Sequence, residues 1–343
     1  MPSGARLPIA LGGVTTKVGK RVGSPLQVRT CPPWFVKRLL VIAGPTGSGK
    51  SALGLDIAQA FNGEIVNCDS VQLYRGFDIG AAKTPLSERR NIPHHLFDIL
   101  SPSETFSAGE YSRVGRRVLD EISGRGRLPV VVGGTGFYLR ALLEGLPELP
   151  GRDEHWRAKL AAREQRRPGS LHRLLSRLDP ETARRIHPND SQKLTRALEV
   201  RIMIRSPLPQ SESAEPLRDY RVLKLGLDPA RPLLNQRLDA RARAMFSSGL
   251  LDEVRGLIAS GATGEEKPFE SINYKQALQH IRGALNFDDA IASMQLETRQ
   301  YAKRQGTWFR RDPEIRWLKG FGDDPAVRDR ALDALQNFYK ENF

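Results

Sequence analysis

Short apolar runs alternate with segments of helical periodicity over the first half of the chain. The apolar runs are Arg38–Ala43, Glu64–Cys68 and Leu128–Val132, and glycine or asparagine lies close to each of them. Between them, apolar residues recur at helical spacing in Lys50–Phe61 and Ser112–Ser123. Short buried strands separated by helices are typical of a parallel sheet that is covered on both faces.

The second half of the chain contains two more short runs and several longer helical stretches. We predict strands at Tyr220–Leu227 and Ile315–Leu318, which would join the same sheet, and long helices over Arg231–Ser260 and Tyr274–Arg304. From about Leu149 to Pro207 the pattern changes to charged helices with few β-branched residues. That segment is either an insertion into the sheet domain or a subdomain of its own.

Together these elements predict an α/β protein whose parallel sheet is flanked by helices, with a helical insertion domain. Residues 38–148 and 208–322 are assigned to the sheet core, 149–207 to the insertion and 323–343 to a C-terminal helix. The segment Ser206–Pro216 is rich in serine and proline, and we expect it to form an exposed loop.

A glycine-rich loop follows the first predicted strand and opens the first predicted helix. It reads Gly44-Pro45-Thr46-Gly47-Ser48-Gly49-Lys50-Ser51 and matches the phosphate-binding pattern G-x-x-x-x-G-K-[ST] in full. Such a loop surrounds phosphates with backbone N–H groups at a helix N-terminus, and Lys50 adds a positive charge. The Ser51 hydroxyl can ligate a Mg²⁺ ion shared with the phosphates. The sequence therefore predicts a P-loop NTPase-like core that binds a di- or triphosphate.

A carboxylate follows the second predicted strand. Asp69 comes directly after Cys68, at the same sheet edge as the phosphate loop, where it could bind metal or accept a proton. The alternative is a helix N-cap, which aspartate serves equally well. The strand Leu128–Val132 runs instead into Gly133-Gly134-Thr135, without the aspartate that organises Mg²⁺ and water in NTP hydrolysis. This difference weakens an ATPase or kinase interpretation without excluding it.

The chain has 343 residues and a formal net charge of +14, which is unevenly distributed. Residues 1–37 contribute +6, residues 151–205 contribute +7 and residues 299–319 contribute +5, so the remainder is slightly acidic. A run of charges is often only a solvated helix face. Two separate basic clusters on an otherwise acidic chain nevertheless favour an RNA or DNA partner.

Residues 1–37 are rich in Gly, Pro and Ser, contain no acidic residue and lack a continuous apolar core for a secretory signal. We expect a disordered tail or a wrongly chosen start codon, with an organelle transit peptide as the alternative. No apolar run in the sequence reaches the length of a membrane span. The two cysteines exclude a disulfide scaffold and a four-cysteine zinc site.

Several motifs in fixed order resemble one family, the tRNA dimethylallyltransferases or IPP transferases. They read GPTGSGKS, NCDSVQLYRGFDIGAAKTP, HHLFDI, VVGGTGFYLRALLEGL, IHPNDSQKLTRALEV and TRQYAKRQ, and the resemblance covers roughly residues 38–319. It implies that the phosphate loop holds the diphosphate of dimethylallyl diphosphate, that ATP is not consumed and that Mg²⁺ is the cofactor. The group would be transferred to N6 of adenosine 37, next to the anticodon, giving N6-isopentenyladenosine and diphosphate.

The resemblance also implies roles for individual residues. Thr46 to Ser51 would grip the diphosphate, Ser51 would hold Mg²⁺, and Arg241 would contact the diphosphate. An arginine fork with backbone amides is a reasonable stabiliser of a departing diphosphate. Asp69 would be the general base for the adenosine amine, a poor nucleophile that needs close alignment. Thr135 would lie near the acceptor base and the leaving group, although it could equally cap a helix.

The family's contacts with the tRNA anticodon stem-loop map onto several segments, some within the basic clusters. They are Asp69, Ser70, Val71 and Gln72; Thr135; Arg157; Gln192, Lys193, Leu194, Thr195 and Arg196; Glu270, Ser271, Ile272, Asn273, Tyr274 and Lys275; and Thr298, Arg299, Gln300, Tyr301, Ala302, Lys303, Arg304 and Gln305. The unpaired target base would be flipped into a pocket. The expected enzyme is a cytoplasmic monomer.

Two positions depart from the family pattern. Asn273 replaces a usual glycine, and asparagine tolerates the left-handed backbone conformation better than most residues. Gly306 replaces a larger residue and loosens its helix by up to about 1 kcal/mol. Both changes bear on tRNA affinity rather than on the chemistry.

Two rival functions share the phosphate loop. An adenylate isopentenyltransferase would use the same donor with a free nucleotide, but it would have no need for the basic insertion. A P-loop kinase or ATPase would turn over ATP without a prenyl donor. Of the remaining candidates, we expect His94 and His95 to lie in a loop or to pack rather than bind metal, and Trp308, Phe309 and Trp317 to be core residues.

Overall fold

A computed structural model describes residues 37–147, 149–208 and 215–341 of the chain. The predicted tail therefore lies outside the described residues except for Lys37, which is the first residue of strand β1 (Lys37–Ala43). Most of the predicted loop Ser206–Pro216 also lies outside them. Among the described residues, no helix combines the length and the apolar character needed to cross a membrane.

The core is one sheet of six parallel strands. In chain order these are β1, β2 (Gly63–Cys68), β3 (His94–His95), β4 (Leu128–Gly133), β5 (Tyr220–Asp228) and β6 (Arg316–Lys319), and their spatial order is β3-β2-β4-β1-β5-β6. All five predicted strands are confirmed. The sixth, β3, arises where we expected a loop at His94 and His95, because the backbone of these residues pairs with Ile65 and Val66.

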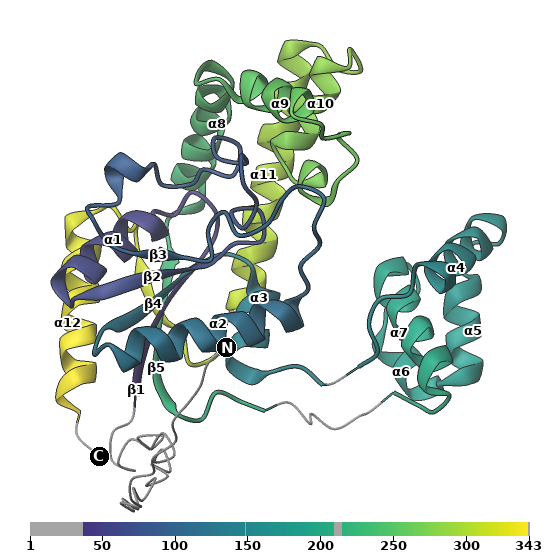
Figure 1. The fold of residues 1–343 in the computed structure, drawn as a ribbon, viewed down its shortest axis with the longest axis horizontal. Helices are drawn as coiled ribbons and strands as arrows, with labels where there is room; N and C mark the ends of the chain where they lie inside the picture. Colours follow the sequence, from purple (N-terminus) through teal and green to yellow (C-terminus); the bar gives the residue numbers. More distant parts are fainter. Residues whose placement is uncertain (1–36, 148, 209–214, 342–343) are drawn as a thin grey trace, which may run out of the picture. The chain divides into compact units, whose positions relative to one another are not determined.

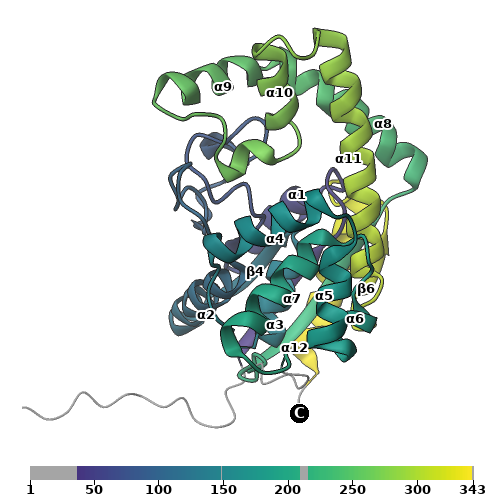
Figure 2. The same cartoon turned by 90° about the vertical axis from the view of Figure 1, so that its right-hand side faces the viewer.

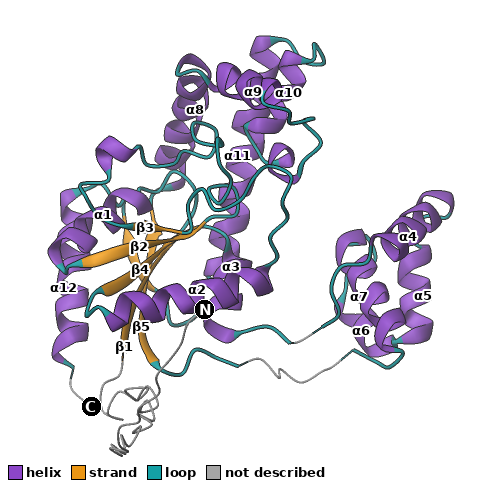
Figure 3. Cartoon of the chain, viewed as in Figure 1, coloured by secondary structure: helices purple, strands orange, loops and turns teal. Residues whose placement is uncertain are grey.

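Helices cover both faces of the sheet (Figure 3). Alternate residues of β1 point to opposite faces, so Leu39 and Val41 pack with α2 (Ala108–Gly124) and α3 (Gly136–Glu144), whereas Leu40 and Ile42 pack with α1 (Lys50–Ala60) and α12 (Pro325–Lys340). This is why the strands read as continuous apolar runs: a parallel strand in the middle of the sheet is buried on both sides. The predicted α/β fold with a P-loop NTPase-like core is confirmed.

A second group of helices follows β5 in the chain and precedes β6, namely α8 (Arg231–Ser247), α9 (Leu250–Ala259), α10 (Tyr274–Ile281) and α11 (Phe287–Phe309). The short 3₁₀ helix η2 (Lys267–Glu270) packs on α10 in this group, and a second one, η1 (Leu86–Glu88), precedes β3. Figures 1 and 2 show α11 as the long helix of this group, extending back toward the sheet. The long helical stretches predicted over Arg231–Ser260 and Tyr274–Arg304 are confirmed, and each of them is divided into two helices. Gly249 (φ 99°) and Gly283 (φ 73°) adopt left-handed conformations that end one helix before the next begins.

The insertion consists of α4 (Glu154–Arg166), α5 (Ser170–Leu178), α6 (Pro180–Arg185) and α7 (Ser191–Ile204). These helices bury a small core of their own, which includes Leu160, Leu175 and Leu198. A buried carboxylate, Glu199, lies beside this core and is neutralised by Arg157 and Arg196. The bounds of the insertion as a domain stay a prediction.

The predicted aromatic core is only partly correct. Phe309 is buried and Trp317 packs at the edge of the main core. Trp308, in contrast, is 40% exposed, so its prediction as a core residue was wrong. The reason is helical geometry: consecutive residues on α11 point in directions about 100° apart, and Phe309 takes the inward one.

Candidate active site at the carboxyl edge of the sheet

Three loops that carry predicted site residues meet at the carboxyl edge of the sheet. The phosphate loop leaves β1, Asp69 follows β2 directly, and Thr135 follows β4. Because β2, β4 and β1 are adjacent parallel strands, their carboxyl ends lie side by side. The sequence places these residues far apart, and the sheet topology brings them together.

The phosphate loop has the backbone conformation that its glycines allow. Gly44, Gly47 and Gly49 all have positive φ, at 141°, 77° and 88°. At Gly49 a Cβ atom would also approach the backbone nitrogen of Gly322 to 2.7 Å, so no larger residue fits there. Helix α1 begins at Lys50 without a side-chain cap, which leaves its first N–H groups available to an anion.

Two cations face this loop. Lys50 donates from Nζ to the backbone oxygen of Pro45 (2.7 Å), and burial lowers the pKa of its ammonium group to about 8, against the opposing effect of the Asp69 carboxylate. Burial also lowers the pKa of the Arg241 guanidinium on α8, again opposed by Asp69. Two partly buried positive charges beside the backbone N–H groups at the start of α1 are well suited to a diphosphate.

Gln305 on α11 connects the phosphate loop to the loop after β4. Its Oε1 accepts a hydrogen bond from the backbone N–H of Thr46 (2.8 Å), and its Nε2 donates to the backbone oxygen of Gly134 (2.9 Å). A Cβ atom at position 134 would lie 2.2 Å from Nε2, which explains the glycine there. Gln305 is 5% exposed, so this side chain supports the site from inside rather than presenting itself to RNA.

The Asp69 carboxylate is held in a tight turn. Its Oδ1 accepts from the backbone N–H groups of Val71 (2.9 Å) and Gln72 (3.4 Å), and its own N–H donates to Oδ1 of Asn67 (2.9 Å). No helix follows this turn, so Asp69 does not serve as a helix N-cap. Its side chain instead forms an Asx-type turn, in which the carboxylate accepts hydrogen bonds from backbone N–H groups two and three residues further along the chain. The second carboxylate oxygen has no hydrogen-bond partner among the described residues, so it is available to a substrate.

Thr135 links this turn to β4. It lies at the N-cap position of α3 but makes no side-chain cap; instead its Oγ1 accepts from the backbone N–H of Ser70 (3.2 Å). The Tyr301 ring lies nearby on α11, one turn before Gln305. Burial and the Asp69 charge raise the pKa of the Tyr301 phenol well above its usual value, and the Thr135 side chain partly opposes this.

The residues around the phosphate loop fit a magnesium ion of the kind that P-loops bind. Ser51 is exposed in the first turn of α1, and its hydroxyl has no protein partner among the described residues. Mg²⁺ in such sites takes one hydroxyl ligand, and phosphate and water oxygens supply the rest. Accordingly, a cluster of three or more metal-binding side chains is not needed, and the described part of the chain contains none.

The predicted RNA contacts differ widely in exposure. The side chains of Leu194, Tyr274, Ala302 and Gln305 are buried, so they support the surface rather than form it. Four others already form ion pairs within the protein: Arg157 and Arg196 with Glu199, Lys275 with Glu297, and Arg299 with Asp239. Gln72 donates to the backbone oxygen of Ala81, and Asn273 has the expected left-handed conformation (φ 83°). Gln192, Gln300, Lys303 and Arg304 are exposed.

Sequence reasoning missed one supporting residue, Asn67, and the supporting role of two others, Tyr301 and Gln305. Asn67 fixes the Asp69 turn through its amide, which also donates to the backbone oxygens of Asp69 and Leu96. Tyr301 and Gln305 face the site together, and their spacing of four residues in TRQYAKRQ was the available signal. The pattern alone could not show which loop that face of the helix would meet.

Comparison with known proteins agrees with this geometry. A family model described as IPP transferase matches residues 72–312. A tRNA dimethylallyltransferase of Solibacter usitatus is 59% identical over 302 residues, which cover 88% of this chain and 98% of that protein. One from Koribacter versatilis is 51% identical over 87% of this chain and 98% of its own length.

Two solved structures are similar over most of the chain. A tRNA isopentenylpyrophosphate transferase from Bacillus halodurans is 34% identical with a TM-score of 0.64, covering 89% of this chain and 96% of that one. A eukaryotic dimethylallyltransferase acting on tRNA is 30% identical with a TM-score of 0.72, covering 89% of this chain and 80% of that one. The chain therefore belongs to the IPP transferase family, the tRNA dimethylallyltransferases.

Proposed function

We propose that this enzyme transfers a dimethylallyl group from dimethylallyl diphosphate to N6 of adenosine 37 in the anticodon loop of tRNA. The observation that carries the proposal is the meeting of an anion-binding loop and an available carboxylate at one sheet edge, with Gln305 and Thr135 between them. One chain supplies all of these groups, so the reaction needs only a monomer.

The donor diphosphate would bind in the phosphate loop. Backbone N–H groups of the loop and of the first turn of α1 would surround it, and Lys50 and Arg241 would offset its charge. These groups would favour the transition state over the bound donor, because negative charge grows on the departing diphosphate. Donor binding would also return the lowered pKa of Lys50 toward its ordinary value.

The transfer step forms one bond, breaks one bond and moves one proton. The adenosine N6 lone pair attacks the allylic carbon, a C–N bond forms, and the C–O bond breaks with its electron pair leaving on diphosphate. The Asp69 carboxylate accepts the amine proton as the bond forms. The Asx-type turn holds this carboxylate in place before substrate arrives, which avoids reorganisation during the reaction.

Mg²⁺, when bound, would neutralise part of the diphosphate charge, with Ser51 as its protein ligand. Replacement of Ser51 by alanine should weaken donor binding in the presence of Mg²⁺ by about tenfold, the loss of one ligand interaction worth about 1.4 kcal/mol. Calorimetric titration with dimethylallyl diphosphate measures this directly. In Mg²⁺-free buffer the variant and the wild-type protein should bind equally, and a deficit there would mean that Ser51 acts on the loop rather than through the metal.

The molecule that accepts the prenyl group distinguishes the proposed function from its two rivals. Labelled dimethylallyl diphosphate is supplied with tRNA, with AMP or with neither, and the label is followed. We expect label in tRNA alone. Label in AMP but not in tRNA would show an adenylate isopentenyltransferase, and ATP hydrolysis without any prenyl transfer would show a P-loop ATPase.

A further inference from the structure

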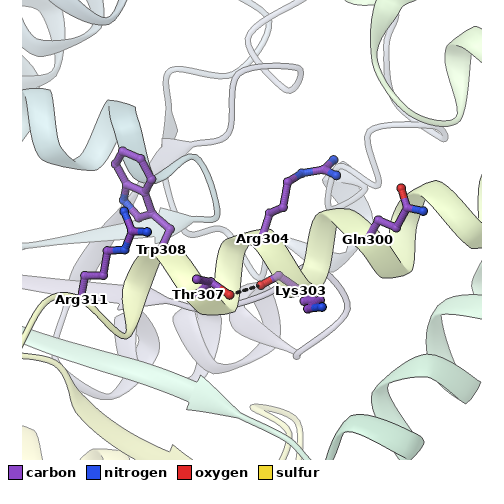
Figure 4. A pocket seen from close by; sticks show the side chains of 6 residues that line it. All are labelled: Gln300, Lys303, Arg304, Thr307, Trp308 and Arg311. Atoms are coloured by element: carbon purple, nitrogen blue, oxygen red, sulfur yellow. Dashed lines mark hydrogen bonds between the residues drawn. The ribbon is translucent and has the colours of Figure 1, made fainter. Parts of the chain in front are cut away.

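An open pocket lies along one side of α11. It has a volume of about 440 Å³ and is lined by five residues of this helix, Gln300, Lys303, Arg304, Thr307 and Trp308, and by Arg311 in the turn that follows it. Figure 4 shows Arg304, Trp308 and Arg311 projecting from one side of the helix. Thr307, Trp308 and Arg311 lie outside every segment that the family resemblance assigned to RNA.

The positive charge of this pocket is not compensated by carboxylates of the described residues. Lys303, Arg304 and Arg311 have no carboxylate partner among the described residues. Neighbouring cations on the same helix are paired: Arg299 with Asp239, and Arg310 with Asp228. Three uncompensated cations on one helix face repel one another, and an external polyanion relieves that repulsion.

Trp308 gives the pocket an aromatic wall. Its ring is 40% exposed, and a Cβ atom at Gly136 would come within 2.2 Å of its indole, so the ring rests directly on the first turn of α3. This contact fixes the ring and leaves the rest of it open to solvent. A fixed, exposed indole among arginines has the chemistry of a stacking platform for an unpaired base.

The pocket lies beside the active site. Trp308 contacts Gly136, the residue after Thr135, and it lies one turn along α11 from Gln305, which binds the phosphate loop. Tyr301, which faces Thr135, lies two turns before Trp308 on nearly the same side of the helix. A base stacked on Trp308 would therefore lie next to a nucleotide whose own base has entered the site.

From these observations we propose that this side of α11 seats the single-stranded part of the anticodon loop that adjoins the target adenosine. Trp308 stacks on a neighbouring base, and Lys303, Arg304 and Arg311 neutralise the phosphates of that strand. The proposal rests on the proposed function, because it takes tRNA as the substrate. It assigns a base-stacking role to Trp308 and a phosphate contact to Arg311.

The test compares Trp308→Ala and Arg311→Ala with Arg328→Ala as the matched control. Arg328 is a partly exposed arginine of α12 whose one carboxylate partner among the described residues is the adjacent Asp329, so its loss removes the same charge away from the pocket. We expect Trp308→Ala to raise KM for tRNA at least about fivefold, the loss of one stacked base, with kcat and the KM for the donor little changed. Arg311→Ala should flatten the dependence of tRNA affinity on salt, and Arg328→Ala should change neither quantity.

A binding measurement keeps this test independent of catalysis. A tRNA anticodon stem-loop is titrated into the full chain, and tryptophan fluorescence is followed; Trp308 is one of four tryptophans. We expect quenching that disappears in Trp308→Phe. Normal quenching in Trp308→Phe, together with unchanged affinity in Arg311→Ala, would overturn the inference. If the wild-type chain binds the stem-loop in this way but transfers no prenyl group, the proposed function fails and the inference stands.

Trp308→Ala removes a ring that packs on α3, so its fold must be checked by thermal unfolding. If that variant is unstable, Arg311→Ala and Lys303→Ala decide the matter, because both residues are exposed and neither has a carboxylate partner in the described part of the chain. Loss of stem-loop affinity in these two variants but not in Arg328→Ala supports the proposal. Affinity equal to that of the wild-type protein in both contradicts it.

Discussion

Replacement of Asp69 by asparagine is expected to lower kcat for prenyl transfer by about 10²–10⁴-fold, the range lost when a positioned general base is removed. Asparagine keeps the oxygen that accepts from the N–H groups of Val71 and Gln72, so the turn should persist. What disappears is the acidic oxygen that takes the proton from the adenosine amine. The Kd for dimethylallyl diphosphate should stay nearly unchanged, since the donor is held mainly by the phosphate loop.

Single-turnover transfer with both substrates saturating measures this effect most cleanly. Asp333→Asn on α12 is the matched control, because Asp333 is an exposed aspartate outside the site. We expect the control to behave as the wild-type protein. Transfer at the wild-type rate by Asp69→Asn, with the protein folded, would remove Asp69 as the base.

Replacement of Gln305 by leucine is expected to weaken donor binding by about tenfold or more, equivalent to at least about 1.4 kcal/mol. The variant leaves the N–H of Thr46 and the backbone oxygen of Gly134 without their partner in a buried setting. Each such group costs about 1–3 kcal/mol when left unsatisfied. The phosphate loop would then lose its fixed geometry, and thermal stability would fall with it.

Calorimetric titration of the donor, with thermal unfolding alongside, distinguishes this role from an RNA contact. A residue that only touches RNA would raise KM for tRNA and leave donor affinity intact. Gln336→Leu, an exposed glutamine of α12, is the control for the change in side-chain type. Unaltered donor affinity in Gln305→Leu, combined with a higher KM for tRNA, would contradict the structural assignment.

The sheet and its functional edge were predictable from the sequence because their signals are local. The run Leu39–Ala43 before Gly44 is apolar at every position since this part of β1 is buried on both faces, and the phosphate-loop pattern follows from its backbone conformation alone. Asp69 was predictable for the same reason: a residue that directly follows a parallel strand must lie at the carboxyl edge.

Features set by distant contacts were not predictable in the same way. The partners of Gln305 are 259 and 171 residues away along the chain, so no local pattern could reveal them. The breaks at Gly249 and Gly283 were missed because apolar periodicity continues across them, although each glycine was a possible helix end. Trp308 was assigned to the core by its residue type, whereas its direction on α11 places it at the surface.

The most direct test of the account is to locate the transferred group within tRNA. Unmodified tRNA is incubated with the enzyme, Mg²⁺ and dimethylallyl diphosphate, digested with a base-specific nuclease, and its fragments are sequenced by mass spectrometry. We predict one added isopentenyl unit, on adenosine 37 next to the anticodon, and its appearance as N6-isopentenyladenosine after complete digestion. Prenylation at another nucleotide, or no gain in mass by tRNA in the presence of active, donor-binding protein, would contradict the account.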